Sequence, residues 1–255
     1  MLEIEGFLKN IHKSEKTQRA YRETLLRFQN FLDGKEPTED RARGFIAQLK
    51  DKGLKPSSIC RHGYALRKYF QWARIPLNLE LPSIPTRVPR WLDKKQIQAL
   101  IIAARNPLER ALIMLLYDSA TRISEVLSLK KEDIDWDGGF IRIIGKGERE
   151  AWVPVGEATL GALQQYLKWY KGKSEYLFPF SYYDVRKWLN GAAKRAGIEN
   201  FHPHILRHSR ASNLRLDGTP IEDLRDLLRH VNINTTMIYA HLKPKELKRK
   251  IKPAF

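Results

Sequence analysis

The 255-residue sequence lacks the features of secreted, disulfide-bonded or membrane-spanning proteins. Cys60 is the only cysteine, so the chain cannot form an internal disulfide or a zinc site built on several thiolates. The N-terminal residues MLEIEGFLKNIHKSEK contain no apolar run long enough for a signal peptide, and no later segment approaches a membrane span. These absences predict a cytoplasmic protein without a membrane partner.

Acidic residues are scarce relative to basic ones. The chain has 46 lysines and arginines against 29 aspartates and glutamates, a formal net charge of +17. Such an excess favours a polyanionic partner, because each phosphate that a cation neutralises releases condensed counterions. Generally basic proteins are common, so charge alone does not identify a function. It makes nucleic acid the first partner to consider.

Helical periodicity marks a first region, which ends at a proline-rich stretch. Residues 14–72 place apolar side chains at helical spacing, interrupted by DGKEPTED and KGLKPSS. Thr38 and either Ser57 or Ser58 are the expected N-caps at these breaks. The following PLNLELPSIPTRVPR disfavours both helix and sheet. We predict a helical domain over residues 1–80 and a linker over residues 81–91.

The next region, residues 92–242, reads as a mostly helical domain with one small antiparallel sheet. Asp93 can cap a helix, and PLERALIMLLYDSA has the wide apolar stripe of a buried one. FIRIIGKGEREAWVPV contains two β-rich runs around Gly145 and Gly147, which predicts a hairpin. The expected fold class is mainly α with a small antiparallel β-sheet. Residues 243–255 form a separate basic C-terminal segment.

Several polar side chains stand where a helical core does not need them. In HPHILRH, His204 and Arg207 are three residues apart and therefore lie on one helix face. Taken singly, each has an ordinary structural interpretation, such as an ion pair with Glu125, a helix cap, a solvated lysine or a core tyrosine. The candidates are Arg122, Lys146, His204, Arg207, His230 and Tyr239.

The order and context of these residues resemble the tyrosine recombinase (phage integrase) family. The matching segments are TRISEVLSLKKEDID, IIGKGEREAWVPV, HPHILRHSRASNL and LLRHVNINTTMIYAHL. The resemblance spans about residues 92–242, and the preceding helical region resembles the family's SAM-like core-binding domain. In its compact size, the chain is most similar to the Xer-type recombinases that resolve chromosome dimers. The resemblance implies the family's DNA breaking-rejoining fold.

The resemblance also implies how DNA would be cleaved. Tyr239 would attack a phosphodiester, forming a 3′-phosphotyrosyl link and releasing a 5′-hydroxyl. Lys146 would protonate the departing oxygen, and His204 would assist proton movement at the tyrosine. A free phenol titrates near pH ~10, so Tyr239 needs cationic neighbours or a base.

The remaining candidates would stabilise charge. The planar guanidinium groups of Arg122 and Arg207 suit the non-bridging oxygens of a phosphorane-like transition state. His230 would add a hydrogen-bond donor, and Glu125 would orient these side chains without reacting itself. Because the phosphotyrosine conserves the energy of the ester, rejoining would need no ATP. The arginines would take the charge role that metals have in many nucleases, so the resemblance implies no cofactor and no metal.

The sequence does not favour a zinc site. His204 and His208 are four apart, as in helical zinc sites, but no glutamate follows the first histidine. Arg207 would also repel the ion.

The implied partner is double-stranded DNA with paired recombination half-sites, bound by a clamp-shaped protomer that assembles as a homotetramer in the synapse. The target sequence and the need for an accessory protein stay open. Two alternatives also stay open: an integrase of a mobile element, and a non-catalytic DNA-binding protein that keeps the fold. DNA relaxation of the type IB topoisomerase kind is expected only as a side reaction.

The sequence departs from the family pattern at three positions. Thr121 stands where glycine is common before the arginine, and Arg229 and Val231 flank His230 where glycine and serine are usual. The C-terminal segment KPKELKRKIKPAF places Leu247 and Ile251 on one potential helix face. It resembles the family segment that docks on a neighbouring protomer.

Overall fold

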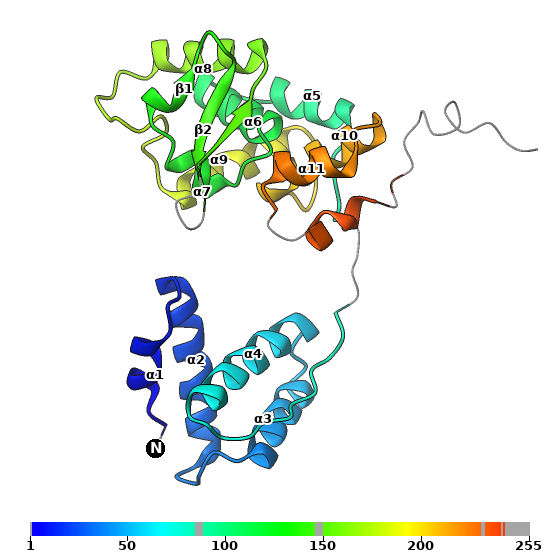
Figure 1. The fold of residues 1–255 in the computed structure, drawn as a ribbon. Helices are drawn as coiled ribbons and strands as arrows, with labels where there is room; N and C mark the ends of the chain where they lie inside the picture. Colours follow the sequence, from blue (N-terminus) through cyan, green and yellow to red (C-terminus); the bar gives the residue numbers. More distant parts are fainter. Residues whose placement is uncertain (1, 85–88, 146–149, 231–232, 241, 243–255) are drawn as a thin grey trace, which may run out of the picture. The chain divides into compact units, whose positions relative to one another are not determined.

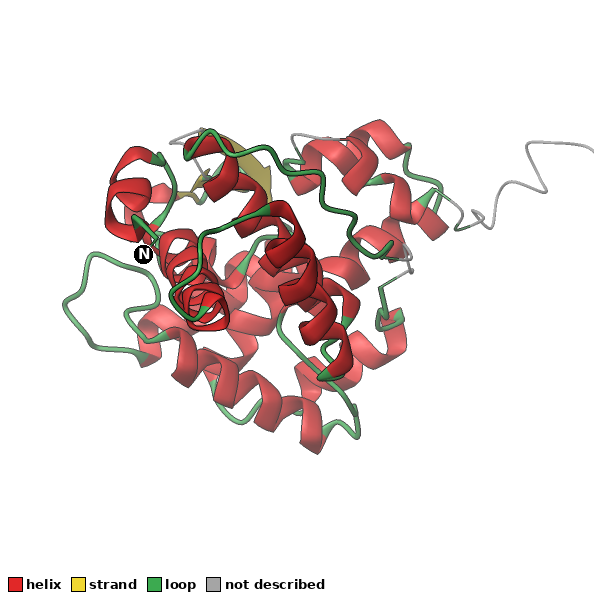
Figure 2. Cartoon of the chain, turned by 90° about the horizontal axis from the view of Figure 1, so that it is seen from below, coloured by secondary structure: helices red, strands yellow, loops and turns green. Residues whose placement is uncertain are grey.

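The structure is a computed structural model, and it describes residues 2–84, 89–145, 150–230, 233–240 and 242. The chain folds into two compact units, within residues 1–86 and 87–255, and each has its own hydrophobic core (Figure 1). Helices predominate in both units, as Figure 2 shows by colour. The fold class predicted from the sequence is therefore confirmed. None of the helices described has the length and apolar character of a membrane span.

The first unit consists of four helices. They are α1 (Ile4–Asn10), α2 (Glu15–Leu32), α3 (Glu39–Asp51) and α4 (Pro56–Trp72). The long helix α2 contacts the other three, and Phe7, Phe28 and Phe70 are fully buried between them. The sequence pattern did not predict α1, because seven residues give too few turns for a clear periodicity.

The helix caps of the first unit follow the sequence only in part. Thr38 caps α3, where its hydroxyl accepts a hydrogen bond from the backbone N–H of Arg41. The expected cap at Ser57 or Ser58 is wrong, since α4 begins earlier, with Lys55 at the N-cap and Pro56 at the first helical position. Proline is favoured there because its missing N–H would have no partner within the helix.

Part of the proline-rich stretch packs against the first unit. Leu79 is buried, and its carbonyl accepts a hydrogen bond from Arg67. The thiol of Cys60 donates to the carbonyl of Pro82 at 3.2 Å. Residues 73–82 thus follow the surface of the helices before the chain reaches the second unit. The predicted linker bounds of 81–91 stay a prediction.

The second unit holds the remaining elements. They are α5 (Lys94–Ile102), α6 (Pro107–Asp118), α7 (Ile123–Leu127), η1 (Lys131–Asp133), β1 (Ile134–Asp135), β2 (Phe140–Ile144), β3 (Glu150–Pro154), α8 (Glu157–Trp169), α9 (Tyr182–Arg195), α10 (His204–Leu216), α11 (Ile221–Leu228), η2 (Ile233–Thr235) and η3 (Met237–Tyr239). Helix α6 lies at the centre and contacts α5, α8, α9 and α10. As its apolar stripe predicted, Leu112 and Leu115 are fully buried. Asp93 caps α5 in a capping box with Gln96.

The sheet is small and antiparallel, with strand order β1-β2-β3. The predicted hairpin is β2–β3, paired from Phe140 opposite Pro154 to Ile144 opposite Glu150. Ile141 and Ile143 face the core, since alternate residues of a strand point to opposite faces. Lys146 follows this pairing and lies outside the described residues.

Candidate active site

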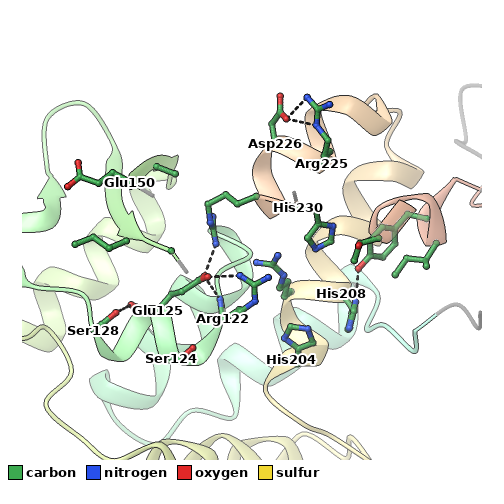
Figure 3. A pocket seen from close by; sticks show the side chains of 18 residues that line it. Arg122, Ser124, Glu125, Ser128, Glu150, His204, His208, Arg225, Asp226 and His230 are labelled. Carbon is green, nitrogen blue, oxygen red and sulfur yellow. Dashed lines mark hydrogen bonds and ion pairs between the residues drawn. The ribbon is translucent and has the colours of Figure 1, made fainter. Parts of the chain in front are cut away.

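A pocket in the second unit collects the candidate side chains (Figure 3). Five segments line it: α7, the end of the β2–β3 hairpin where Ile144 pairs with Glu150, α10, α11 with the turn after it, and residues 233–239. The sequence-predicted residues that the structure brings together here are Arg122, Glu125, His204, Arg207, His230 and Tyr239. Gly145 also lines the pocket, so the chain approaches it directly before Lys146.

Glu125 organises one wall of the pocket. Its carboxylate accepts hydrogen bonds from the backbone N–H of Arg122 at 2.8 Å and from Arg122 Nη1 at 2.7 Å. Arg229 Nη2 donates to the same carboxylate at 2.7 Å. Burial alone would raise the pKa of Glu125, but the Arg122 N–H and the charges of Arg229 and Arg122 lower it. The expected pair of Arg122 and Glu125 is present, and Arg229 turns it into a three-membered bridge.

Arg207 is held by backbone. Its side chain is almost completely buried, and its guanidinium donates to the carbonyl of Ala120 at 2.6 Å and to the carbonyl of Leu228. In the described part of the chain, no carboxylate forms an ion pair with it. Burial, then the charges of Arg122 and Arg229, lower the pKa of Arg207 to about 10. It therefore remains a cation at pH 7.

Two left-handed backbone positions shape the turns that hold Arg207. Ala120 has φ +50° and Arg229 has φ +52°. This region favours glycine because it brings Cβ close to the following carbonyl. Arg229 does occupy a position where a glycine would fit, as the family pattern suggested. Before Arg122 the left-handed residue is Ala120 rather than Thr121. Val231 lies outside the described residues.

Three histidines line the pocket, His204, His208 and His230, and they make different contacts. His230 Nδ1 bonds the hydroxyl of Thr236 at 2.9 Å, which ties the turn after α11 to the segment that carries the tyrosine. Burial and the nearby Arg207 and Arg122 lower the pKa of His230 to about 4. His204 is exposed at the first turn of α10, with its ring perpendicular to that of His208 and 4.7 Å away.

Tyr239 ends the short 3₁₀ helix η3 and is firmly held. Only 1% of its surface is exposed, and its ring packs in a cluster with Ala211 and Leu228. Its hydroxyl lies 2.6 Å from Nδ1 of His208 (Figure 3). The resemblance implied that His204 would assist proton movement at the phenol. The structure instead places His208 there, a residue that the sequence suggested only as a zinc ligand.

The family models match nearly the whole chain. The model described as "Phage integrase family" matches residues 90–246, and "Phage integrase, N-terminal SAM-like domain" matches residues 4–75. The chain is 31% identical to tyrosine recombinase XerA of Pyrococcus horikoshii, over 99% of this chain and 90% of that protein. The chain belongs to the phage integrase family. The resemblance read from the sequence is thereby confirmed.

Other relatives agree with this assignment. Tyrosine recombinase XerC of Staphylococcus epidermidis is 29% identical over 92% of this chain and 90% of that protein. Among solved structures, the XerH site-specific recombinase in a post-cleavage complex has a TM-score of 0.76 at 21% identity, covering 91% of this chain and 78% of that one. A lambda integrase dimer has a TM-score of 0.72 at 18% identity, covering 95% and 94%. These structures share the fold of this phage integrase family member.

The bridge at Glu125 predicts a measurable coupling. We expect Glu125→Ala to lower the free energy of unfolding by about 3 kcal/mol at pH 7, because it leaves Arg229 buried and unpaired. In an Arg229→Gly background the same substitution should cost at least about 1 kcal/mol less. Urea denaturation of the four proteins measures the cycle, and equal costs in both backgrounds would refute the bridge.

The loss of unfolding free energy in Glu125→Ala should also depend on pH. The pKa of Glu125 is lowered in the folded state, so its stabilising charge is complete above the ordinary glutamate pKa. It is lost as the pH falls through the folded-state pKa. The difference between wild type and Glu125→Ala should therefore shrink in acid.

Proposed function

We propose that this chain is a site-specific tyrosine recombinase that cleaves and rejoins DNA strands through a 3′-phosphotyrosyl intermediate. One observation carries the proposal: a single pocket contains Tyr239 together with Arg122, Arg207 and His230. A phenol beside buried and half-exposed guanidinium groups suits attack on a phosphodiester, whose charge grows in the transition state.

Each arginine has a different part in this proposal. Arg207 is fixed by two carbonyls, so its remaining N–H groups offer a rigid site for a non-bridging oxygen. The side chain of Arg122 is 45% exposed and keeps free donors beyond its bond to Glu125. His230 adds a donor to the same oxygens, while His204 lies at the pocket edge. Lys146 is our proposed general acid for the 5′ oxygen.

Double-stranded DNA is the proposed partner. The net charge of +17 favours a polyphosphate, and the XerH structure is described as bound to a palindromic difH substrate. We further propose paired half-sites and a homotetrameric synapse. The similarity to XerA and XerC favours an Xer-type role in chromosome dimer resolution over a mobile-element integrase.

Covalent capture tests this function. A nicked suicide substrate loses the short strand segment after cleavage, so the enzyme cannot rejoin it and stays attached to the 3′ phosphate. Wild-type protein should form this adduct, and proteolysis with mass spectrometry should map it to the peptide containing Tyr239. Tight binding without any adduct would instead support the non-catalytic DNA-binding protein.

The C-terminal segment, residues 243–255, lies outside the described residues, and docking on a neighbouring protomer stays our proposal for it. A protein truncated after Leu242 should bind a single half-site nearly as well as wild type. It should lose cooperative occupancy of paired sites, which electrophoretic mobility shifts measure. A free basic arm would give the reverse: weaker single-site binding with a flatter salt dependence.

A further inference from the structure

The hydroxyl of Tyr239 has one hydrogen-bond partner among the described residues, Nδ1 of His208 at 2.6 Å. The two side chains come from α10 and η3, which pack against each other. Their rings are 6.2 Å apart and tilted by 46°. Both line the pocket with Arg207. The contact therefore joins the proposed nucleophile to a base, not to a packing residue.

The direction of this hydrogen bond follows from burial. Tyr239 is 1% exposed, so its O–H hydrogen needs an acceptor within the protein. If Nδ1 of His208 carried a hydrogen and donated it, the phenolic hydrogen would have no acceptor in the described structure. The 2.6 Å contact suits the phenol as donor to the neutral tautomer of His208 that carries its hydrogen on Nε2.

We propose that His208 holds the phenol of Tyr239 and accepts its proton as the phenolic oxygen attacks DNA. This step rests on the proposed recombinase function and deepens it. The Oη–P bond forms while the phenolic proton passes to Nδ1, and the bond from phosphorus to the 5′ oxygen breaks. That oxygen takes a proton from a separate acid, for which we propose Lys146. Rejoining reverses the step, with His208 returning the proton to the phenolate.

The charges around His208 make it a base that strengthens when DNA is bound. Burial, followed by electrostatic repulsion from His204, His202, Arg207 and His230, lowers its pKa to about 4. The imidazole is therefore neutral at pH 7. Burial raises the pKa of Tyr239 to about 12, although Arg207 opposes this. A phosphodiester in the pocket brings negative charge close to these cations, which raises the basicity of His208.

Three variants separate holding from proton transfer. Asparagine can accept a hydrogen bond close to the position of Nδ1, but it is not a base. His208→Asn should therefore bind DNA and keep its thermal stability, while single-turnover cleavage of the suicide substrate falls by about 10²-fold. His208→Ala should lose as much or more. The matched control is His12→Asn, whose histidine is exposed in the first unit and outside the pocket lining, and it should cleave like wild type.

Chemical rescue gives a readout that a purely structural role would not move. Added imidazoles should restore cleavage by His208→Ala, and the rescued rate should rise with the pKa of the imidazole. Rescue that depends on the size of the imidazole and not on its pKa would overturn the proposal. Cleavage by His208→Asn within about threefold of wild type would overturn it as well.

A modified substrate separates the base from the acid. When sulfur replaces the bridging 5′ oxygen, the leaving thiolate needs no proton. Lys146→Ala should then recover, whereas His208→Asn should stay impaired, and its recovery would contradict a role as base. Wild-type protein serves as the reference throughout. If it forms no adduct at Tyr239, the recombinase function itself fails, and this outcome differs from a normal adduct with unaffected His208 variants.

Discussion

Tyr239→Phe should bind DNA normally and form no covalent complex on a nicked suicide substrate. The substitution removes only the hydroxyl, so the ring can keep its place among Ala211 and Leu228. The lost hydrogen bond to His208 costs a modest amount of stability, about 1 kcal/mol. The loss of the nucleophile, in contrast, leaves no group to form the phosphotyrosyl link.

The measurement is denaturing electrophoresis of labelled DNA, beside a mobility shift under native conditions. Tyr183→Phe is the control, because that tyrosine is 73% exposed on α9 and is not part of the pocket lining. It should form the adduct at the wild-type rate. An adduct formed by Tyr239→Phe would remove this residue from the mechanism.

Arg207→Ala should lower the cleavage rate by at least about 10²-fold, as expected when a fixed donor to the transition state is lost. Arg207→Lys should recover little of this. A lysine is a single cationic point, so it cannot bond the carbonyls of Ala120 and Leu228 together and still offer a planar face to a phosphate. Arg122→Ala should also lower the cleavage rate by about 10²-fold.

The same experiment distinguishes arginine from metal catalysis. If the guanidinium groups carry the charge, wild-type cleavage should persist in excess EDTA. Circular dichroism and thermal unfolding should accompany each variant, because Arg207 also joins two turns of the fold. A strict need for Mg²⁺ or Zn²⁺ would mean that the arginines have another role.

The sequence was sufficient to predict features that depend on local spacing. The buried helix α6, the β2–β3 hairpin and the Asp93 cap depend on residues a few positions apart. Six of the residues that the order of motifs singled out line the pocket, namely Arg122, Glu125, His204, Arg207, His230 and Tyr239.

Contacts between distant segments were not predictable in this way. His208 and Tyr239 are 31 residues apart, and only the packing of η3 on α10 makes them partners. Arg229 gave a partial signal, since it replaces a usual glycine. Its bond to Glu125, 104 residues away, has no local pattern.

Arg207 has a consequence for how the pocket distinguishes a substrate from a transition state. Because it is held by neutral carbonyls, its charge is not cancelled, while Arg122 and Arg229 share the one carboxylate of Glu125. These four side chains therefore leave two positive charges unmatched. A phosphodiester carries one negative charge, and its five-coordinate transition state carries two. The two unmatched positive charges balance the transition state better than they balance the bound phosphodiester. Electroneutrality therefore favours catalysis over simple retention of DNA.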